Sequence, residues 1–196
     1  MTSSVIKLKE FGEDRFVSIL QNLKETNLDR NRSWWEPLLR QYFDTRRYLE
    51  WFFVIEESGE LQGFSTIQQF YPKAFRVLTR CFIYPQYRRP VLPKYDTFMS
   101  PASYMINSQL MYLQDEYETA FISLEGIKRN RTIINMAKKM EINTGLQWSV
   151  GEYMYQTCAN SESSSCWQNI CYTGKEPSLA KMSRDDWIEK YGKLSY

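Results

Sequence analysis

The stretch YPQYRRPVLPKY at residues 84–95 holds the side chains best suited to binding a charged ligand. It brings Arg88, Arg89 and Lys94 close together in the sequence. Guanidinium groups bind phosphates through paired N–H donors, and an ammonium group does so as a point charge. Pro90 and Pro93, which follow the arginines, have no main-chain N–H to donate. The stretch is therefore suited to contact an anionic ligand through side-chain charge.

The same stretch also has the composition of a surface that binds another protein. Tyr84, Tyr87 and Tyr95 stand beside the arginines and the prolines. Tyrosine and arginine are enriched at the energetic centres of protein interfaces, and proline lowers the entropy that a loop loses on binding. A protein partner at residues 84–95 is therefore a second interpretation.

The chain has no histidine. This absence removes the Ser-His-Asp and Cys-His arrangements of nucleophilic catalysis and most ordinary zinc sites. Acid–base chemistry must then fall to Glu, Asp, Tyr, Cys or Lys side chains, or to the substrate itself. We expect no metal cofactor.

The four cysteines show no C-x-x-C spacing. They are Cys81, Cys158, Cys166 and Cys171. Without a secretory context they are most simply buried or free thiols. A bridge between Cys158 and Cys166 across the segment ANSESSS is the alternative.

The composition is that of a folded globular chain. Its 196 residues are 43% apolar and 16% aromatic, which is enough to bury one core. The formal net charge of +2, with dispersed Lys and Arg, gives nucleic-acid binding no support from bulk electrostatics. Stacking of Tyr and Trp on bases beside Arg keeps single-stranded nucleic acid as a third hypothesis.

The start of the chain, MTSSVIKLKEFGEDRF, is charged and lacks the apolar segment of a signal peptide. No apolar run approaches the ~20 residues of a membrane span. We therefore expect a cytoplasmic protein without membrane contact.

Hydrophobic periodicity and turn residues divide the chain into strands and helices. In the strand at 74–84, Val77, Thr79 and Cys81 alternate with residues of the other face. Ser100 is placed to cap a helix whose first residue is Pro101. The predicted strands are 4–11, 48–57, 61–71, 74–84, 119–126, 147–158 and 166–173, and the predicted helices are 13–26, 33–47, 102–116, 130–140 and 184–191.

This order predicts an α/β (α+β) architecture: a mixed, mostly antiparallel central sheet flanked by helices. The three strands from 48 to 84 form an antiparallel meander, and a helix separates them from the next strand. We expect one domain over residues 1–176 and a C-terminal extension with a short helix at 177–196. The last two strands pair either within the chain or across a homodimer.

The order and lengths of these elements resemble the GCN5-related N-acetyltransferase (GNAT) fold over roughly residues 4–173. IYPQYRR at 83–89 resembles the family's V-x-P-x-[YF]-R-[RG], which leads into its acyl-CoA pyrophosphate loop. EGIKRNRTIINMAKKM at 125–140 resembles the end of its fifth strand and the following helix, with Asn130 where an Asn often contacts the cofactor arm.

The resemblance implies an acyl-CoA-dependent N-acyltransferase, with acetyl-CoA as donor and a small-molecule or protein amine as acceptor. In it a carboxylate takes the proton of the attacking ammonium, and Glu125 is our candidate. Tyr153 or Tyr155 is the candidate acid, and Trp34 and Trp35 are expected near the acceptor. The implied cofactor contacts are main-chain groups of Phe82 and Ile83 and the side chains of Arg88, Arg89, Lys94 and Asn130.

Two departures from the family pattern support a competing hypothesis. The glycine places of the family's phosphate loop fall on Val91 and Pro93, or on Leu92 and Lys94, so the usual N–H cradle cannot form there. The place of the family's acidic Tyr falls on Ala137. The alternative is a catalytically inactive module of the same fold that binds or assembles with a protein.

Overall fold

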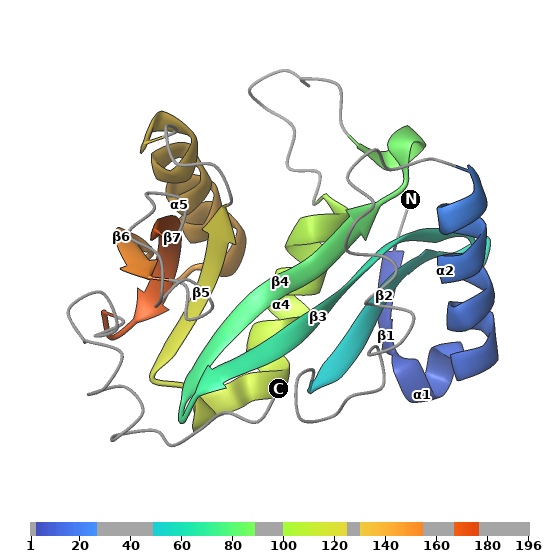
Figure 1. Ribbon diagram of the computed structural model, residues 1–196, viewed down its shortest axis with the longest axis horizontal. Helices are drawn as coiled ribbons and strands as arrows, with labels where there is room; N and C mark the ends of the chain where they lie inside the picture. The colour runs from blue at the N-terminus through green and yellow to red at the C-terminus, as the bar shows by residue number, and fades with distance from the viewer. Residues whose placement is uncertain (1–2, 27–48, 89–99, 125–129, 155–166, 177–196) are drawn as a thin grey trace. The chain divides into compact units, whose positions relative to one another are not determined.

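In the computed structural model, the described residues are 3–26, 49–88, 100–124, 130–154 and 167–176 (Figure 1). They form, in chain order, β1 (Ser3–Lys7), α1 (Leu8–Phe11), α2 (Glu13–Thr26), β2 (Glu50–Glu56), β3 (Leu61–Tyr71), β4 (Ala74–Ile83), the 3-10 turn η2 (Pro85–Tyr87), α4 (Pro101–Leu113), the 3-10 turn η3 (Gln114–Glu116), β5 (Thr119–Leu124), α5 (Asn130–Thr144), β6 (Ser149–Met154) and β7 (Trp167–Gly174).

Within these residues, seven strands form one sheet in the order β1-β2-β3-β4-β5-β7-β6. β4 and β5 run parallel, whereas β1–β2, β2–β3, β5–β7 and β6–β7 are antiparallel pairs. The predicted mixed, mostly antiparallel sheet and its meander are confirmed. The last two strands pair within the chain, from Ser149↔Tyr172 to Met154↔Trp167.

The contacts divide the chain into two compact units. Unit 1 comprises Met1–Gln68 and Leu78–Gln109, and unit 2 comprises Gln69–Val77 and Leu110–Tyr196. The boundary passes through β3, β4 and α4, so each of these elements contributes to both units. The organisation as one domain over 1–176 with an extension at 177–196 stays a prediction.

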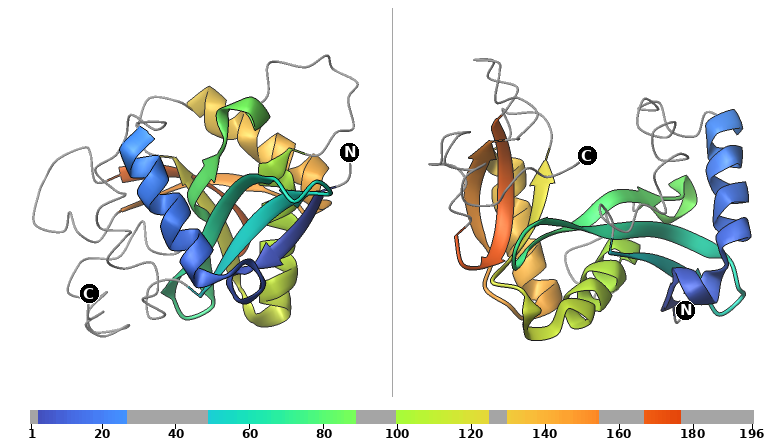
Figure 2. Two further views of the ribbon diagram at one scale, coloured as in Figure 1. Left: turned by 90° about the vertical axis from the view of Figure 1, so that its right-hand side faces the viewer. Right: turned by 60° about the horizontal axis from the view of Figure 1, so that its bottom comes forward.

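An aromatic cluster between α2 and the strands forms the core of unit 1. Phe16 of α2 lies 4.8, 5.0 and 5.3 Å, ring centre to ring centre, from Trp51, Phe53 and Phe64. Phe64 contacts Phe82 at 5.6 Å. Tilted and edge-on pairs at such separations stabilise a core beyond the area they bury. The cluster fixes α2 over β2, β3 and β4, and the left view of Figure 2 shows the helix in front of these strands.

The first predicted strand is wrong beyond Lys7. The structure ends β1 there and turns the chain through the single helical turn α1. Gly12 closes this turn with φ 95°, and its N–H donates to the carbonyl of Leu8 at 2.9 Å. The turn carries Phe11 onto Phe53, with the rings stacked at 4.0 Å. Burial of Phe11 therefore overrides the alternation that predicted a strand up to this residue.

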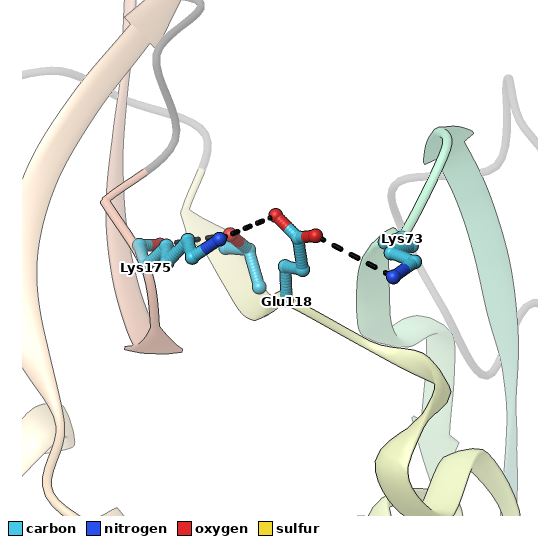
Figure 3. A network of polar contacts seen from close by, with 4 residues as sticks. Lys73, Glu118 and Lys175 are labelled. Carbon is cyan, nitrogen blue, oxygen red and sulfur yellow. Dashed lines mark hydrogen bonds and ion pairs between the residues drawn. The ribbon is translucent and has the colours of Figure 1, made fainter.

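An exposed ion-pair network joins three segments of unit 2 (Figure 3). Glu118, which precedes β5, pairs with Lys175 after β7 at 3.0 Å and with Lys73 in the β3–β4 turn at 3.6 Å. Main-chain bonds support it, because the N–H of Glu118 donates to Lys73 O at 2.7 Å and that of Lys175 donates to Glu118 O at 2.7 Å. The hydrogen bond and charge of Lys175 hold the pKa of the Glu118 carboxyl below its usual 4.5.

Several sequence predictions lie outside the described residues. They include the helices at 33–47 and 184–191 and both ends of the proposed bridge, Cys158 and Cys166. In the described part, Cys81 and Cys171 are free thiols, exposed and buried respectively. Burial raises the pKa of Cys171 to about 12. Among the same residues, none of the helices combines the length and apolar character that crossing a membrane requires.

Candidate functional site at the end of β4

The strand β4 does not keep the alternation predicted from the sequence. Leu78 and Arg80 have φ of 51° and 50°, a left-handed conformation that residues with a Cβ rarely adopt. Val77 and Thr79 are buried as predicted, but Cys81, next in the series, is exposed. The alternation is therefore wrong beyond Thr79, because the two left-handed residues make the strand irregular.

At this irregularity the main-chain N–H of Leu78 donates to a buried glutamine side chain instead of to a neighbouring strand. Gln109 of α4 is fully buried, and its Oε1 accepts from the main-chain N–H of Leu78 at 2.8 Å. Its Nε2 donates to Ser65 Oγ at 2.8 Å, and Ser65 Oγ donates to the sulfur of Met105 at 3.1 Å. Both ends of the amide are thus satisfied, as a buried polar group requires.

Beyond the irregularity, β4 is held closely against β3. The N–H of Tyr84 donates to Gln62 O at 3.0 Å. Neighbouring residues of an antiparallel strand direct their main-chain groups to opposite edges, so those of Ile83 point away from β3. Gly63 permits the close approach, since a Cβ there would lie 2.5 Å from the carbonyl oxygen of Phe82. The end of β4 therefore presents main-chain groups of Ile83 on its other edge.

The side chain of Arg88 folds back over this strand end. Its Nε donates to the carbonyl oxygen of Ile83 at 2.6 Å, and its Cζ lies 5.2 Å from the ring centre of Phe82. A guanidinium held by Nε over an aromatic face keeps its terminal N–H groups in a fixed direction. One positive charge is thereby fixed at the end of β4.

Side-chain hydrogen bonds join the turn η2 to the β2–β3 hairpin. Gln86 Nε2 donates to Glu60 at 3.4 Å, and Tyr87 also makes a hydrogen bond to Glu60. Desolvation first, and then the Glu60 bond and the charges of Glu56 and Glu60, raise the pKa of Tyr87 to about 12. Tyr87 is therefore neutral at physiological pH and anchors the turn from which Arg88 extends.

The helix α4 begins as the sequence predicts. Ser100 caps it, because its Oγ accepts from the N–H of Ser103 at 3.3 Å and lies 2.9 Å from Ser103 Oγ. Pro101 occupies the first helical position. The Gln109–Leu78 bond joins the later part of the helix to the middle of β4, and α4 runs beside β4 in Figure 1.

In unit 2, the strand β5 carries a buried hydroxyl that has no hydrogen-bond partner among the described residues. The parallel ladder of β4 with β5 consists of Ala74↔Thr119, Phe75↔Ala120 and Arg76↔Phe121. On its other edge, β5 pairs with β7 as far as Leu124. Among the described side chains, Ser123 Oγ is buried without a hydrogen-bond partner. Such a group costs free energy unless a further molecule satisfies it.

The structure describes only part of the predicted site. Phe82 and Ile83 end β4, and Arg88 lies beside them. Asn130 is the first residue of α5, and Tyr153 pairs with Gln168 in the β6–β7 ladder, but their side chains are not described. The remaining predicted site residues, which are Glu125, Arg89 and Lys94, and the acceptor candidates Trp34, Trp35 and Tyr155 lie outside the described residues.

Sequence reasoning missed Gln109. A glutamine among apolar residues of a helix was a signal, since a fully buried amide needs partners for both its ends. Nothing in the sequence identified Leu78 as that partner, because the irregularity of β4 carries no glycine to mark it.

The sequence matches no protein family model and none of the curated proteins with which it was compared. Solved structures do match. A GNAT-family acetyltransferase from Staphylococcus aureus Mu50 is 9% identical with TM-score 0.50, over 88% of this chain and 98% of that chain. A mutant of the spermidine N-acetyltransferase SpeG from Vibrio cholerae is 10% identical with TM-score 0.52, over 87% and 92%. The chain has the GNAT fold.

A chimera of Vibrio cholerae SpeG with hSSAT is similar to the same extent. It is 10% identical with TM-score 0.52, over 88% of this chain and 95% of that chain. At such identities the likeness concerns the fold. It confirms the fold inferred from IYPQYRR at 83–89 and from the order of the elements. Within the GNAT fold of this chain, the described residues contain no cluster of metal-binding side chains.

Two kinds of polar group lie together at the described end of β4. The main-chain groups of Ile83 lie on the edge away from β3, and the carbonyl there already accepts from Arg88 Nε. The guanidinium of Arg88 places one positive charge beside them. No glycine stands at 84–95, so phosphate binding would depend on such side chains.

Proposed function

We propose that the chain is a divergent member of the GNAT superfamily and transfers an acyl group from acetyl-CoA to an amine. The observation that carries the proposal is the strand end of β4, where Ile83 presents its main-chain edge and Arg88 fixes a positive charge beside it. The matched SpeG proteins are named as spermidine N-acetyltransferases, which supports an amine as the acceptor class. We also propose a cytoplasmic location.

The reaction joins the amine nitrogen to the acyl carbon and breaks the carbon–sulfur bond, so coenzyme A leaves as the thiol. In the proposed assignment, Glu125 accepts the ammonium proton, directly or through water, and Tyr153 protonates the leaving sulfur. Asn130, Arg89 and Lys94 join Arg88 and the main chain of Phe82 and Ile83 in holding the cofactor. Most of the catalysis comes from orienting the two reactants.

The first test is calorimetric titration of the purified chain with acetyl-CoA and with free coenzyme A. We expect micromolar binding of both, since the shared nucleotide and pantetheine parts make the contacts. No binding at millimolar ligand would overturn the proposal and turn the search to protein partners of residues 84–95. A screen of amine acceptors, read by release of free thiol, then identifies the substrate.

The second test is Glu125→Gln. The amide has nearly the same shape but cannot take a proton, so we expect turnover to fall about 10²-fold or more while the affinity for acetyl-CoA stays near the wild-type value. The pH dependence of kcat/KM should lose its acidic limb. A wild-type rate would remove Glu125 as the base.

A further inference from the structure

Two features of the irregular part of β4 would each lower the stability of the fold if nothing compensated for them. Leu78 and Arg80 hold left-handed φ values of 51° and 50° although both have a Cβ, a conformation that destabilises the backbone of such residues. Leu78 also directs its N–H to a side chain instead of a neighbouring strand. Strained backbone of this kind persists only where the surroundings fix it.

The surroundings that fix it are the buried amide of Gln109 and its partners. Gln109, Ser65 and Met105 are all fully buried. The amide oxygen has one donor at 2.8 Å, and the amide nitrogen has one acceptor at 2.8 Å, so flipping the amide would break both bonds. The side chain is therefore held in one orientation, and its oxygen faces Leu78.

The position of Leu78 decides which groups β4 presents further along. Ile83 lies five residues later, and its carbonyl holds Arg88. In a strand, a shift of one residue sends each main-chain group to the opposite edge. If the irregularity at Leu78 relaxed into a regular strand, the main-chain N–H and C=O groups of Cys81 and Ile83 would point toward β3. Those of the neighbouring residues would then point toward the opposite edge.

We propose that Gln109 is a positioning residue for the cofactor edge of β4: through the Leu78 N–H it fixes the irregularity that directs the Ile83 main-chain groups and Arg88 toward the ligand. This inference rests on the proposed function, since the ligand is the acyl-CoA arm. Gln109 itself contacts neither the cofactor nor the reacting atoms.

The test compares two variants that remove different halves of the same buried network. Gln109→Met keeps the volume and removes the acceptor of the Leu78 N–H. Ser65→Ala leaves that acceptor in place and removes the partner of the amide nitrogen. Both variants lose a buried hydrogen bond, so both lower the unfolding temperature. Only Gln109→Met should weaken coenzyme A binding, by about tenfold, with Ser65→Ala within about twofold of wild type.

Amide hydrogen exchange gives a readout that is independent of the cofactor. In Gln109→Met we expect faster exchange at Leu78 and altered exchange at Cys81 and Ile83, and in Ser65→Ala we expect wild-type exchange at these amides. Gln109→Glu keeps an acceptor oxygen toward Leu78 and should recover the pattern. If Gln109→Met does not fold, Gln109→Leu, which also lacks an acceptor for the Leu78 N–H, takes its place.

The outcomes separate this inference from the proposed function. If the wild-type chain binds no coenzyme A, the proposed function fails, and the exchange pattern alone decides whether Gln109 positions β4. Equal coenzyme A affinities in wild type and Gln109→Met, or identical exchange in Gln109→Met and Ser65→Ala, would overturn the inference.

Discussion

Arg88 binds the carbonyl oxygen of Ile83 through its Nε atom, at 2.6 Å, and lies over the ring of Phe82. The bond uses Nε and leaves both terminal guanidinium nitrogens for an end-on bidentate contact with a phosphate. A lysine could not make both contacts with the same geometry. The strand end and the charge that follows it are therefore joined by direct contacts.

This relationship predicts the effect of Arg88→Ala. We expect coenzyme A affinity to fall by about tenfold at low salt, with a smaller difference at high salt because screening weakens charge contacts. Arg88→Lys should recover part of the loss. Arg15→Ala is the matched control, since Arg15 also lies over a phenylalanine ring, 4.4 Å from the centre of Phe11, but on the first helices. Calorimetric titrations that give Arg88→Ala and Arg15→Ala the same affinity would contradict the assignment.

The close pairing of β3 with β4 predicts that Gly63→Ala destabilises unit 1. The new Cβ would meet the carbonyl oxygen of Phe82 at 2.5 Å, and main chain cannot move aside as a side chain can. We expect a loss of about 1–3 kcal/mol in the free energy of unfolding, measured by urea titration.

Gly151→Ala serves as its control. The nearest atom to that Cβ is Cε1 of the Tyr172 ring at 3.2 Å, and a ring can rotate away. The cost should be smaller, and the lower entropy of the unfolded chain opposes it. Equal losses in the two variants would show that contact with Phe82 is not the cause.

The buried hydroxyl of Ser123 predicts an unusual combination of effects. Ser123→Ala removes a polar group that has no partner among the described residues, so the unfolding free energy should rise by about 1 kcal/mol. If the proposed ligand satisfies this hydroxyl, the same variant should bind acetyl-CoA or the amine more weakly. Thermal unfolding and calorimetry on the same preparation check both effects. A stability below wild type would show that the hydroxyl has a partner in the folded chain.

The Lys73–Glu118–Lys175 network predicts a specific response to acid. The pKa of Glu118 is lower in the folded chain than in the unfolded chain, chiefly through the hydrogen bond from Lys175. Its contribution to stability is therefore complete above the unfolded value of 4.5 and is lost as pH falls through the folded value. Glu118→Gln should show a shallower loss of stability with falling pH in this range.

Since the three side chains are largely exposed, the difference should be small and should shrink as salt is added. Unfolding temperatures measured from pH 7 downward at two salt concentrations give the comparison. Parallel curves for the wild type and Glu118→Gln would remove Glu118 from the acid response.

Much of the fold could be predicted from the sequence because local patterns and burial agree over most of it. The helix at Glu13–Thr26 and the cap at Ser100 followed from periodicity and capping chemistry alone. The strand at Leu8–Phe11 was wrong because the stacking of Phe11 on Phe53 is a long-range contact that no local pattern contains. The irregularity of β4 was missed for the same reason, since Gln109 lies 31 positions after Leu78.

The candidate site was predictable in part. IYPQYRR correctly located the end of β4, and Arg88 lies beside it. The ligand contact of Arg88 stays a prediction. The role of Tyr87 was not predictable, because its bond to Glu60 depends on how the β2–β3 hairpin meets the turn. Glu125, Asn130 and Tyr153 keep their assignments as predictions.

The strand order of unit 2 has a consequence for how the chain folds during synthesis. β7 lies between β5 and β6, although it is made after both, and it supplies the hydrogen-bonding partner of each. Until Trp167–Gly174 has left the ribosome, β5 lacks its antiparallel neighbour and β6 has none. The described members of the aromatic cluster of unit 1, by contrast, have all emerged once Tyr84 is made. Unit 1 can therefore begin to fold early, whereas unit 2 must wait for its last strand, with unpaired strand edges exposed to chaperones or to aggregation in the meantime.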